Sequence, residues 1–531
     1  MTTLTYFGDA FTGIEDPAFF FESAFFDPLT GDVNVDILSQ STTLLILSNA
    51  ATGYTTRVVG TGLTLSGTPG NEVPVAGTIS AISFEDTSLN FGTIPDQVVA
   101  RLTNLSWDFV SFSNALDAIS ENSDFSLLAD LFNEDGPITL DGSQATSDFR
   151  VPDILGELQP LLTEDMTVIG GPAYDVLIGG LGNDSIITGQ NNGETFGGQI
   201  VATEGNDTID FSDAGPADGP WFSYSARVDG AFTFNLDVVS NQSSVVGQSF
   251  TDTLVDLRNL VISEGLGIGS GDGADIFNVT NDEGGFINIL GAEGADTYNI
   301  SLNGGTVRLS FRDASDAFDL SFEAAPQGLV ADLTQGEIFN DGFGFSETVN
   351  ILEGTGTLEI QGTENNDSII GSDINDSFIT QQGNDTIDGG AGFDRVRYDR
   401  SGVDVVNVNL ALGTAAVTHV EFTFNEDTFE EEETFFSFTD SLTSIESVRG
   451  SRDGNDTLIS GDGIDALLDG RGGDDTIVGA NGNDTLIGDN GMDSINGGSG
   501  ADLIDGGAGN DSIFGGDQAD TISGGDGNDT V

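Results

Sequence analysis

The last stretch of the chain, residues 451–531, repeats every nine residues. It divides into nine copies, with Asp469 as one extra residue between the second and the third: SRDGNDTLI, SGDGIDALL, GRGGDDTIV, GANGNDTLI, GDNGMDSIN, GGSGADLID, GGAGNDSIF, GGDQADTIS and GGDGNDTV. Aspartate occupies position 6 of every copy, and position 8 is always aliphatic, from Leu458 and Leu467 to Val531. A flexible linker would not keep an aliphatic residue at one register, so the repeat predicts a folded structure.

Each copy combines a turn with a short strand. Glycine at positions 1, 2 and 4 permits a positive φ and a close approach of neighbouring backbone. A Thr or Ser at position 7 followed by an aliphatic residue at position 8 is typical of a strand with one side chain buried. Two copies then close one flattened coil, and successive coils stack at about 4.8 Å. The sequence therefore predicts a mainly β solenoid.

Stacking would bring every second position-6 aspartate close to its equivalent. Two unit charges roughly 5 Å apart repel by about 1 kcal/mol in water and by about 3 kcal/mol at an effective dielectric constant of 20. Summed along a ladder, this repulsion rivals the roughly 5–15 kcal/mol that stabilises a whole domain. A divalent cation between successive turns would reverse its sign, and carboxylate and carbonyl oxygens suit Ca²⁺. We therefore expect several calcium ions and folding that depends on them.

The predicted calcium ligands in this stretch are the position-6 aspartates and the position-4 glycines. The aspartates are Asp456, Asp465, Asp475, Asp484, Asp493, Asp502, Asp511, Asp520 and Asp529. The glycines are Gly473, Gly482, Gly491, Gly500, Gly509 and Gly527.

These units, such as GGAGNDSIF, resemble the RTX (hemolysin-type) calcium-binding nonapeptide GGxGxDxUx. The resemblance implies a parallel β-roll, export through type I secretion machinery without an N-terminal signal peptide, and folding outside the cell on meeting calcium. It places the protein in the extracellular space or at the cell surface. RTX proteins continue into a capping segment and a secretion signal, so we expect the natural chain to extend past Val531, whose copy ends at position 8.

Further copies precede the regular stretch. Four run from 362 to 397, two begin at Gly170 and Gly179, and three stand alone. They add Asp184, Asp207, Asp275, Asp296, Asp385 and Asp394, with Gly182 and Gly383, to the predicted ligands. Position 4 departs from glycine at Ala173, Asn365, Ile374 and Gln518, which puts calcium binding in doubt near Asp175, Asp367, Asp376 and Asp520.

Four regions follow from these patterns. Residues 1–165 hold no nonapeptide; strand-like segments, including 101–112, precede a helical patch at 114–132, so we expect a small β-rich α+β domain that caps the solenoid. Residues 168–400 read as an interrupted RTX solenoid with non-repeat β segments. Residues 401–450 read as an interspersed β segment with an acidic insertion, and 451–531 as the regular roll.

Composition excludes several partners and chemistries. The net charge is −75, from 88 acidic and 13 basic residues, and every basic residue is arginine. Such a surface repels nucleic acid and anionic lipid, and no segment is apolar enough for membrane insertion. The absence of lysine removes Schiff-base and P-loop chemistry, and the absence of cysteine removes disulfides and thiolate metal sites.

No catalytic motif is found, so we do not predict an enzyme. The single histidine, His419, lies in the strand-like VTHVEFTF and is interpreted as a solvent-facing strand residue rather than a general base. The acidic stretch 421–436 is interpreted as an exposed insertion with some phenylalanines packed back, against the alternative of an extra cation or partner site.

Three arginines, Arg395, Arg397 and Arg400, gather in FDRVRYDR. On a strand, Arg395 and Arg397 share the face opposite Val396 and Tyr398. One hypothesis is a site for a carboxylated or sulfated glycan, because arginine binds such anions bidentately. The favoured alternative is pairing with aspartates on adjacent coils.

The sequence therefore predicts a secreted calcium-binding repeat protein with a structural, adhesive or surface-layer-like role. Two alternatives stay open: a glycan-binding or glycan-modifying exoprotein, with extracellular polysaccharide or a cell surface as partner, and a non-catalytic fragment of a larger RTX exoprotein.

Overall fold

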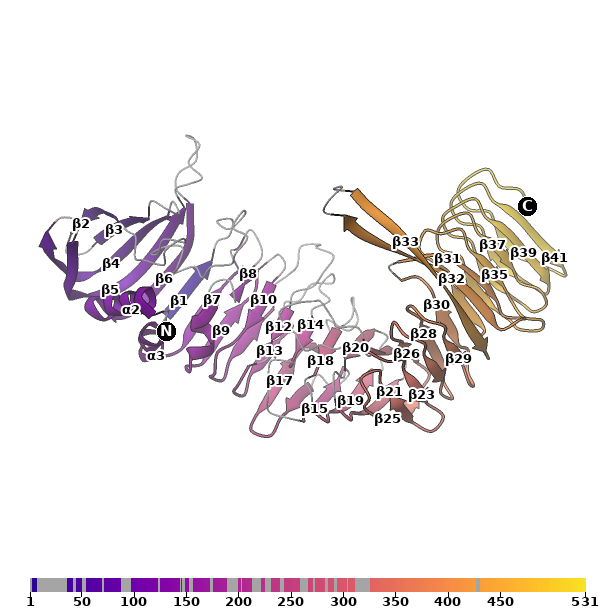
Figure 1. The fold of residues 1–531 in the computed structure, drawn as a ribbon, viewed down its shortest axis with the longest axis horizontal. Helices are drawn as coiled ribbons and strands as arrows, with labels where there is room; N and C mark the ends of the chain where they lie inside the picture. Colours follow the sequence, from indigo (N-terminus) through magenta and orange to yellow (C-terminus); the bar gives the residue numbers. More distant parts are fainter. Residues whose placement is uncertain are drawn as a thin grey trace. The chain divides into compact units, whose positions relative to one another are not determined.

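A computed structural model gives the fold (Figure 1). The structure describes residues 2–6, 36–41, 44–49, 54–68, 71–86, 97–122, 125–143, 145, 149–151, 156–171, 175–188, 199–201, 203–212, 221–224, 231–238, 243–257, 266–270, 273–281, 285–290, 294–302, 304–310, 325–400, 402–425 and 430–531. The chain forms two compact units, Met1–Gly269 and Ser270–Val531. This division is coarser than the four regions predicted from the sequence, which stay a prediction.

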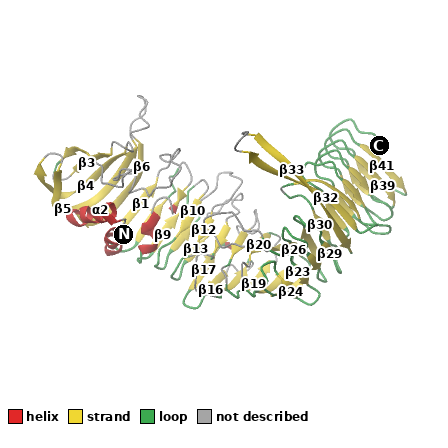
Figure 2. Cartoon of the chain, in the orientation of Figure 1, coloured by secondary structure: helices red, strands yellow, loops and turns green. Residues whose placement is uncertain are grey.

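The first unit begins with an antiparallel sheet. Its strands are β1 (Thr2–Tyr6), β2 (Asp36–Gln40), β3 (Leu44–Asn49), β4 (Tyr54–Thr68), β5 (Asn71–Asp86) and β6 (Gln97–Asp108). Two helices follow, α2 (Phe109–Asn122) and α3 (Ser126–Glu134), shown in red in Figure 2. The ring of Trp107 packs edge-on against Phe132 with centroids 4.8 Å apart, which ties α3 to the sheet. No described helix is long and apolar enough to cross a membrane.

One strand prediction in this part is wrong. The segment 101–112 was expected to be a strand throughout, but the strand ends at Asp108 and α2 begins at Phe109. The carboxylate of Asp108 accepts a hydrogen bond from the backbone N–H of Ser111, which satisfies one free donor of the first helical turn. Phe109 and Phe112 are buried on the helix, so the apolar residues read as a strand belong to a helical face.

Coils follow the helices in the first unit. One parallel sheet contains β7 (Ile138–Asp141), β9 (Met166–Ile169), β11 (Ser185–Ile187), β13 (Thr208–Asp210) and β17 (Thr251–Val255). The other contains β8 (Phe149–Arg150), β10 (Asp175–Ile178), β12 (Gln199–Val201), β14 (Trp221–Ser223) and β18 (Leu266–Gly269). β1 pairs in parallel with β7, so the antiparallel sheet continues into the coils.

The second unit repeats this two-sheet arrangement. One sheet is parallel throughout: β20 (Phe286–Leu290), β22 (Thr306–Ser310), β26 (Thr357–Gln361), β28 (Asn375–Ile379), β30 (Arg395–Arg397), β34 (Ser447–Arg449), β36 (Leu467–Asp469), β38 (Thr485–Ile487), β40 (Leu503–Asp505) and β42 (Thr521–Ser523). The facing sheet ends in the parallel strands β35 (Thr457–Ile459), β37 (Thr476–Val478), β39 (Ser494–Ser499) and β41 (Ser512–Asp517). Successive copies thus lie on opposite sheets, and copies 18 residues apart are neighbours, which confirms the predicted mainly β solenoid of parallel coils.

Among the described residues, three antiparallel meanders interrupt the coils. They are β15 (Thr233–Asp237), β16 (Ser243–Val246) and β17; β23 (Val330–Asp332), β24 (Glu337–Asn340) and β25 (Glu347–Gly354); and β31 (Val403–Asn409), β32 (Thr414–Asn425) and β33 (Glu430–Thr443). The meander strands belong to the sheet that faces the all-parallel sheet. In the second unit this facing sheet also contains β19 (Ile276–Asn281), β21 (Thr297–Leu302), β27 (Ser368–Ile370) and β29 (Thr386–Asp388). Outer strands of the meanders pair in parallel with neighbouring coils, as β33 does with β29 and β31 with β35. The loosely recurring strands that separate the nonapeptide blocks are therefore built into the solenoid.

The aliphatic residue at position 8 forms the core of the regular roll. Leu458, Ile477, Leu486 and Ile504 are fully buried between the two sheets. In the second copy the buried residue is Leu468, and the predicted Leu467 is half-exposed. The prediction of Leu467 as a core residue is wrong because the extra residue of this copy lies within its turn, between Ser460 and Ile464, and not after its strand.

Candidate metal centre

Aspartates at position 6 form two hydrogen-bonded ladders in the second unit, one along each sheet. Each aspartate's backbone N–H donates to the Oδ1 atom of the aspartate one coil further on: Asp475 to Asp493 at 2.8 Å, Asp493 to Asp511 at 2.9 Å, and Asp484 to Asp502 at 3.0 Å. One carboxylate oxygen is therefore used to hold neighbouring coils together. The other oxygen decides whether a cation is needed.

The structure places most of the predicted aspartates, with buried side chains, on these ladders or on the matching ladder of the first unit. They are Asp184, Asp207, Asp275, Asp296, Asp385, Asp394, Asp456, Asp475, Asp484, Asp493, Asp502 and Asp511. Asp520 and Asp529, on the final coil, join the ladders but are half-exposed.

Asp465 is the exception. It is exposed, and its Oδ1 atom accepts a hydrogen bond from the backbone N–H of Asn483 at the neighbouring position-5 column. Ala466 takes its place on the ladder and donates to Asp484 Oδ1 at 2.8 Å. The predicted register of this copy is therefore wrong by one residue, and the ladder lacks a carboxylate there.

Four ladder acids were missed by the sequence analysis. Asp252, Glu347, Asp440 and Glu446 accept hydrogen bonds from the backbone N–H groups of Asp207, Asp296, Asp385 and Asp394, respectively. Each is followed by a Thr or Ser and then by an aliphatic residue, which is the pattern of positions 6 to 8. Searching for this triplet alone, without the glycines, would have found them.

The second carboxylate oxygen, Oδ2, distinguishes two kinds of turn. In what we call a closed corner, the residue after the turn glycine donates its backbone N–H to Oδ2. This occurs from Gly180 to Asp184 at 2.7 Å, Thr363 to Asp367 at 2.9 Å, Ser372 to Asp376 at 2.5 Å and Ser451 to Asp456 at 2.6 Å. The hydroxyls of Thr363, Ser372 and Ser451 also donate to the same carboxylates, so protein groups satisfy them.

In what we call an open corner, the residue after the turn glycine is left-handed and gives Oδ2 no hydrogen bond. Its φ is 77° at Arg471, 66° at Ala480, 71° at Asp489, 100° at Gly498 and 95° at Gly507. Oδ2 is then buried and accepts no hydrogen bond from any described group at Asp475, Asp484, Asp493, Asp502 and Asp511. Asp394 has the same corner, with Gly390 at φ 91°.

The turn glycine of an open corner lies in a cradle of oxygens. A Cβ atom built on Gly479 would lie 2.5 Å from Asp484 Oδ2 and 2.5 Å from the carbonyl oxygen of Gly497 on the next coil. At Gly506 the corresponding distances, to Asp511 Oδ2 and to the carbonyl oxygen of Gly524, are both 2.6 Å. An orphaned carboxylate oxygen and a carbonyl oxygen therefore converge at a corner that only glycine can occupy.

This donor set fits calcium. The oxygens are hard donors from carboxylates and backbone, which suit Ca²⁺ in a shell of about six to eight ligands. Among the described residues, no group of three or more His, Asp or Glu side chains is placed to hold a metal ion, so backbone carbonyls must complete the shell. The position-4 glycines bring these carbonyls close: Gly482, Gly491 and Gly500 have φ of 149°, 145° and 154°, where only glycine is unstrained.

Burial also shifts the protonation of the ladder. It raises the pKa of Asp475 to about 8 and the pKa values of Asp484 and Asp493 to about 6, although backbone hydrogen bonds oppose the shift. The pKa of Asp385 rises to about 9 because burial and the charges of Asp367 and Asp440 act together. A bound cation would compensate these buried charges near neutral pH.

Tyrosine hydroxyls satisfy the acids of two meanders. Tyr224 donates to Asp252 Oδ2 at 2.7 Å, and Tyr398 donates to Asp440 Oδ2 at 2.9 Å. Both tyrosines are fully buried and directly follow a strand, where the regular copies carry the turn glycine. These acids have a protein donor in the position that a cation would take.

The family model for the RTX calcium-binding nonapeptide repeat matches residues 167–194, 361–396, 469–504 and 496–531. The chain carries RTX calcium-binding repeats. Its calcium-binding repeats coincide with the coils described above, and three of the four matched segments contain open corners. No curated protein matches the chain.

Two further predictions, for His419 and for the acidic stretch 421–436, concern residues outside the aspartate ladders. His419, in β32, is half-buried, and its Nδ1 atom accepts or donates no hydrogen bond among the described residues, so the prediction of a solvent-facing side chain is wrong. Its ring packs on the backbone at Gly402, where a Cβ atom would meet the imidazole. In the acidic stretch, Phe435 and Phe436 are exposed on β33 rather than packed back, and the side chains of 421–433 lie outside the described residues.

Proposed function

We propose that this RTX protein is a secreted, calcium-folded solenoid with a structural or adhesive role outside the cell. The observation that carries the proposal is the series of open corners from Asp475 to Asp511, each with a buried Oδ2 atom lacking a described donor. We assign the calcium ions to these corners, with Oδ2 and the turn carbonyls as ligands. Asp184 and Asp456, although predicted as ligands, share the closed corner of Asp367 and Asp376.

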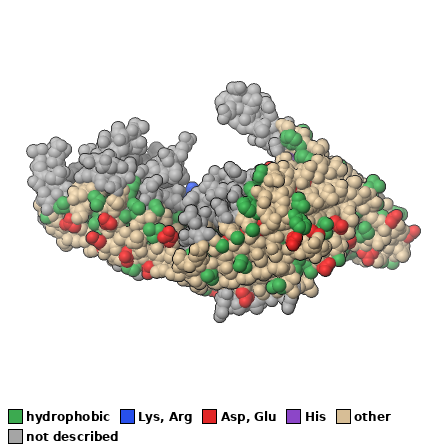
Figure 3. Space-filling view, turned by 60° about the horizontal axis from the view of Figure 1, so that its bottom comes forward, with side chains coloured by type: hydrophobic (Ala, Val, Ile, Leu, Met, Phe, Trp, Pro, Cys, Tyr) green, Lys and Arg blue, Asp and Glu red, His purple; other side chains and the backbone are tan. Residues whose placement is uncertain are grey.

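The surface supports a site of action rich in calcium. On the face drawn in Figure 3, acidic side chains are spread over the described surface and basic ones are almost absent from it. A chain of net charge −75 would repel itself on folding unless cations neutralise part of that charge. Extracellular modules bind calcium with Kd on the order of 10⁻⁴–10⁻³ M, which keeps the chain unfolded at lower calcium concentrations.

Circular dichroism of the full chain, first in EGTA and then in millimolar calcium, tests the proposal. The expected result is a coil spectrum that converts to β, with magnesium much less effective because it demands a smaller, octahedral site. A β spectrum of full amplitude in EGTA at neutral pH would contradict it.

A further inference from the structure

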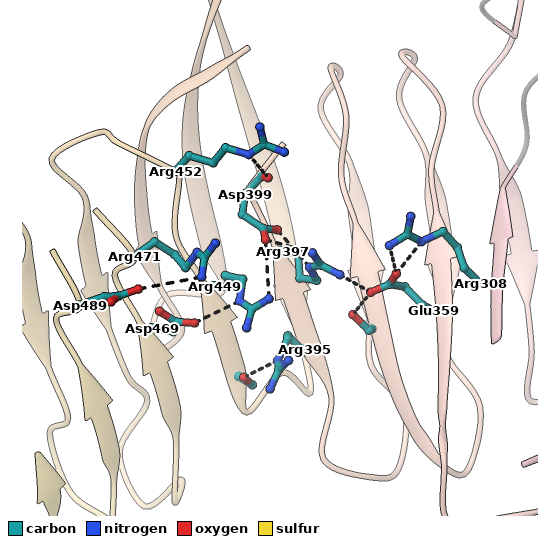
Figure 4. A network of polar contacts seen from close by, with 12 residues as sticks. Arg308, Glu359, Arg395, Arg397, Asp399, Arg449, Arg452, Asp469, Arg471 and Asp489 are labelled. Atoms are coloured by element: carbon teal, nitrogen blue, oxygen red, sulfur yellow. Dashed lines mark hydrogen bonds and ion pairs between the residues drawn. The ribbon is translucent and has the colours of Figure 1, made fainter. Parts of the chain in front are cut away.

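Four arginines of the second unit lie on strands of its all-parallel sheet: Arg308, Arg395, Arg397 and Arg449 (Figure 4). In β30, Val396 is buried and Arg395 and Arg397 share the opposite face, as the alternation predicted. Arg397 forms ion pairs with Glu359 at 2.6 Å and with Asp399 at 2.9 Å, and Glu359 also pairs with Arg308. Arg397 is therefore paired with carboxylates, but these are Asp399, two residues along the chain, and Glu359, two strands away, and not aspartates on an adjacent coil as predicted.

Arg395 differs from Arg397. Its Nε atom donates to Ser447 Oγ at 3.1 Å, and it forms no ion pair with any described carboxylate. Arg449, which pairs with Asp469 at 3.0 Å and lies 3.6 Å from Asp399, is its cationic neighbour. Burial together with Arg449 and Arg397 lowers the pKa of Arg395. The charges of Asp469 and Glu359 partly oppose this shift, but no described carboxylate pairs directly with Arg395, which is unexpected in a chain with 88 acidic residues.

Arg395 lies on the wall of a groove of about 260 Å³. The groove crosses strands β22, β26, β28 and β30, and therefore runs from coil to coil. Its lining combines two aromatic rings with hydroxyl and amide groups: Phe286, Phe393, Thr306, Thr357, Asn375 and Ser377. Arg397 and two carboxylates also line it: Glu359 is paired with Arg308 and Arg397, and Asp376 is buried. The Phe393 side chain is 40% exposed, so its ring is available to a ligand.

We propose that this groove binds an acidic saccharide, with Arg395 as the residue that binds its carboxylate or sulfate group. An exposed aromatic ring packs on the apolar face of a sugar, and Ser, Thr and Asn side chains hydrogen-bond its hydroxyls. Arginine binds carboxylate and sulfate through paired N–H donors. A linear chain suits a groove that crosses successive coils at about 4.8 Å per strand. Nucleic acid fits less well because the surrounding surface is strongly negative.

The test is isothermal titration calorimetry on the calcium-loaded full chain. The probes are trigalacturonate, a chondroitin sulfate tetrasaccharide, the neutral methyl ester of trigalacturonate, inorganic sulfate and an oligothymidylate; trimers avoid the calcium gels that long polyuronates form. At least one acidic saccharide should bind about tenfold more tightly than the neutral ester and than sulfate. Equal binding of the neutral ester, of sulfate or of the oligothymidylate would overturn the proposal.

Two variants locate the site. Arg395→Gln should weaken saccharide binding about tenfold, whereas Arg471→Gln, which removes a half-exposed arginine beside Asp489 and outside the groove, should change it less than about twofold. Phe393→Ala, at an exposed position, should weaken saccharide binding about threefold. It provides a second test of the site if Arg395→Gln fails to fold. The calcium-induced circular dichroism change, measured on each variant, separates this proposal from the proposed calcium function. Unchanged binding in a folded Arg395→Gln or Phe393→Ala chain would refute the site.

Discussion

The coils at 362–379 and the coils at 470–531 share one repeat but differ in what satisfies the ladder carboxylates. In the first, Thr363 and Ser372 donate backbone and hydroxyl hydrogen bonds to Asp367 and Asp376. In the second, left-handed corners turn these donors away and leave Oδ2 buried without one. Under the proposed assignment of calcium to the open corners, backbone and hydroxyl donors at the closed corners take the place of the cation. It predicts that calcium dependence varies along the solenoid and is strongest in the terminal roll.

Acidification should have the largest effect, because it neutralises the ladder without metal. Burial raises the pKa of Asp475 to about 8 and those of Asp484 and Asp493 to about 6, above the unfolded value near 4. Raised pKa values in the folded state mean that protonation stabilises the calcium-free fold: the stabilisation is complete below about pH 4 and is lost as pH rises through about 6 to 8. Circular dichroism in EGTA should therefore show β structure near pH 4–5 and its loss by about pH 8. If the calcium-free chain lost β structure on acidification, the claim that charge on the buried ladder carboxylates destabilises its fold would be contradicted.

Neutralising two open corners should have the next largest effect. Asp493→Asn with Asp502→Asn keeps an Oδ1 acceptor for the ladder but removes the charge that attracts the cation. The calcium midpoint of folding should rise about tenfold or more, equivalent to about 1.4 kcal/mol or more. The matched pair Asp367→Asn with Asp376→Asn, at closed corners, should shift it less than about twofold. If calcium titration gave equal shifts of the folding midpoint for both pairs of variants, open and closed corners would not differ in calcium binding.

Ladder acids of two meanders receive their hydrogen bond from a tyrosine hydroxyl, and Tyr398→Phe tests how much this hydrogen bond contributes to stability. It removes the hydroxyl that donates to Asp440 Oδ2 and leaves a buried carboxylate oxygen short of a donor. The free energy of unfolding should fall by about 1–3 kcal/mol. Urea denaturation in saturating and in tenfold lower calcium should give the same loss, because no cation is expected at this acid. Tyr298→Phe, whose contact with Asp296 is 3.4 Å long, is the control with a smaller expected loss.

The smallest effect concerns backbone strain at an open corner. Ala480 has a φ of 66°, where a non-glycine residue costs about 1 kcal/mol. Ala480→Gly should therefore stabilise the calcium-loaded roll by up to about 1 kcal/mol in thermal or urea unfolding. Ala508→Gly, one position later in its turn and not left-handed, should destabilise it by about 0.5–1 kcal/mol. If Ala480→Gly destabilised the roll and Ala508→Gly stabilised it, the left-handed conformation assigned to the open corners would be contradicted.

The sequence predicted the solenoid well because its period is set by backbone geometry. Aspartate at position 6 and an aliphatic residue at position 8 determine which side chains face inward, and Leu458, Ile477 and Leu486 are buried as expected. It failed at Asp465, because an extra residue can be absorbed on either side of the strand and the letters alone do not say which.

The difference between open and closed corners could not be predicted from the motif. It depends on whether the residue after the turn glycine is left-handed, and that conformation is taken by Arg471, Ala480 and Asp489 as well as by glycine. The acids of the meanders were missed for a related reason: Asp252 and Asp440 join the ladder through long-range strand pairing rather than through a nonapeptide. Hydroxyl residues mark three of the four closed corners, at Thr363, Ser372 and Ser451; the fourth has Gly180 and leaves no such signal.

The most direct measurement is anomalous diffraction from crystals of the calcium-loaded chain. Calcium peaks should lie beside the Oδ2 atoms of Asp484, Asp493, Asp502 and Asp511, and none should lie beside Asp367 or Asp376. Empty corners in the terminal roll, or equal peaks at Asp367 and Asp376, would contradict the account.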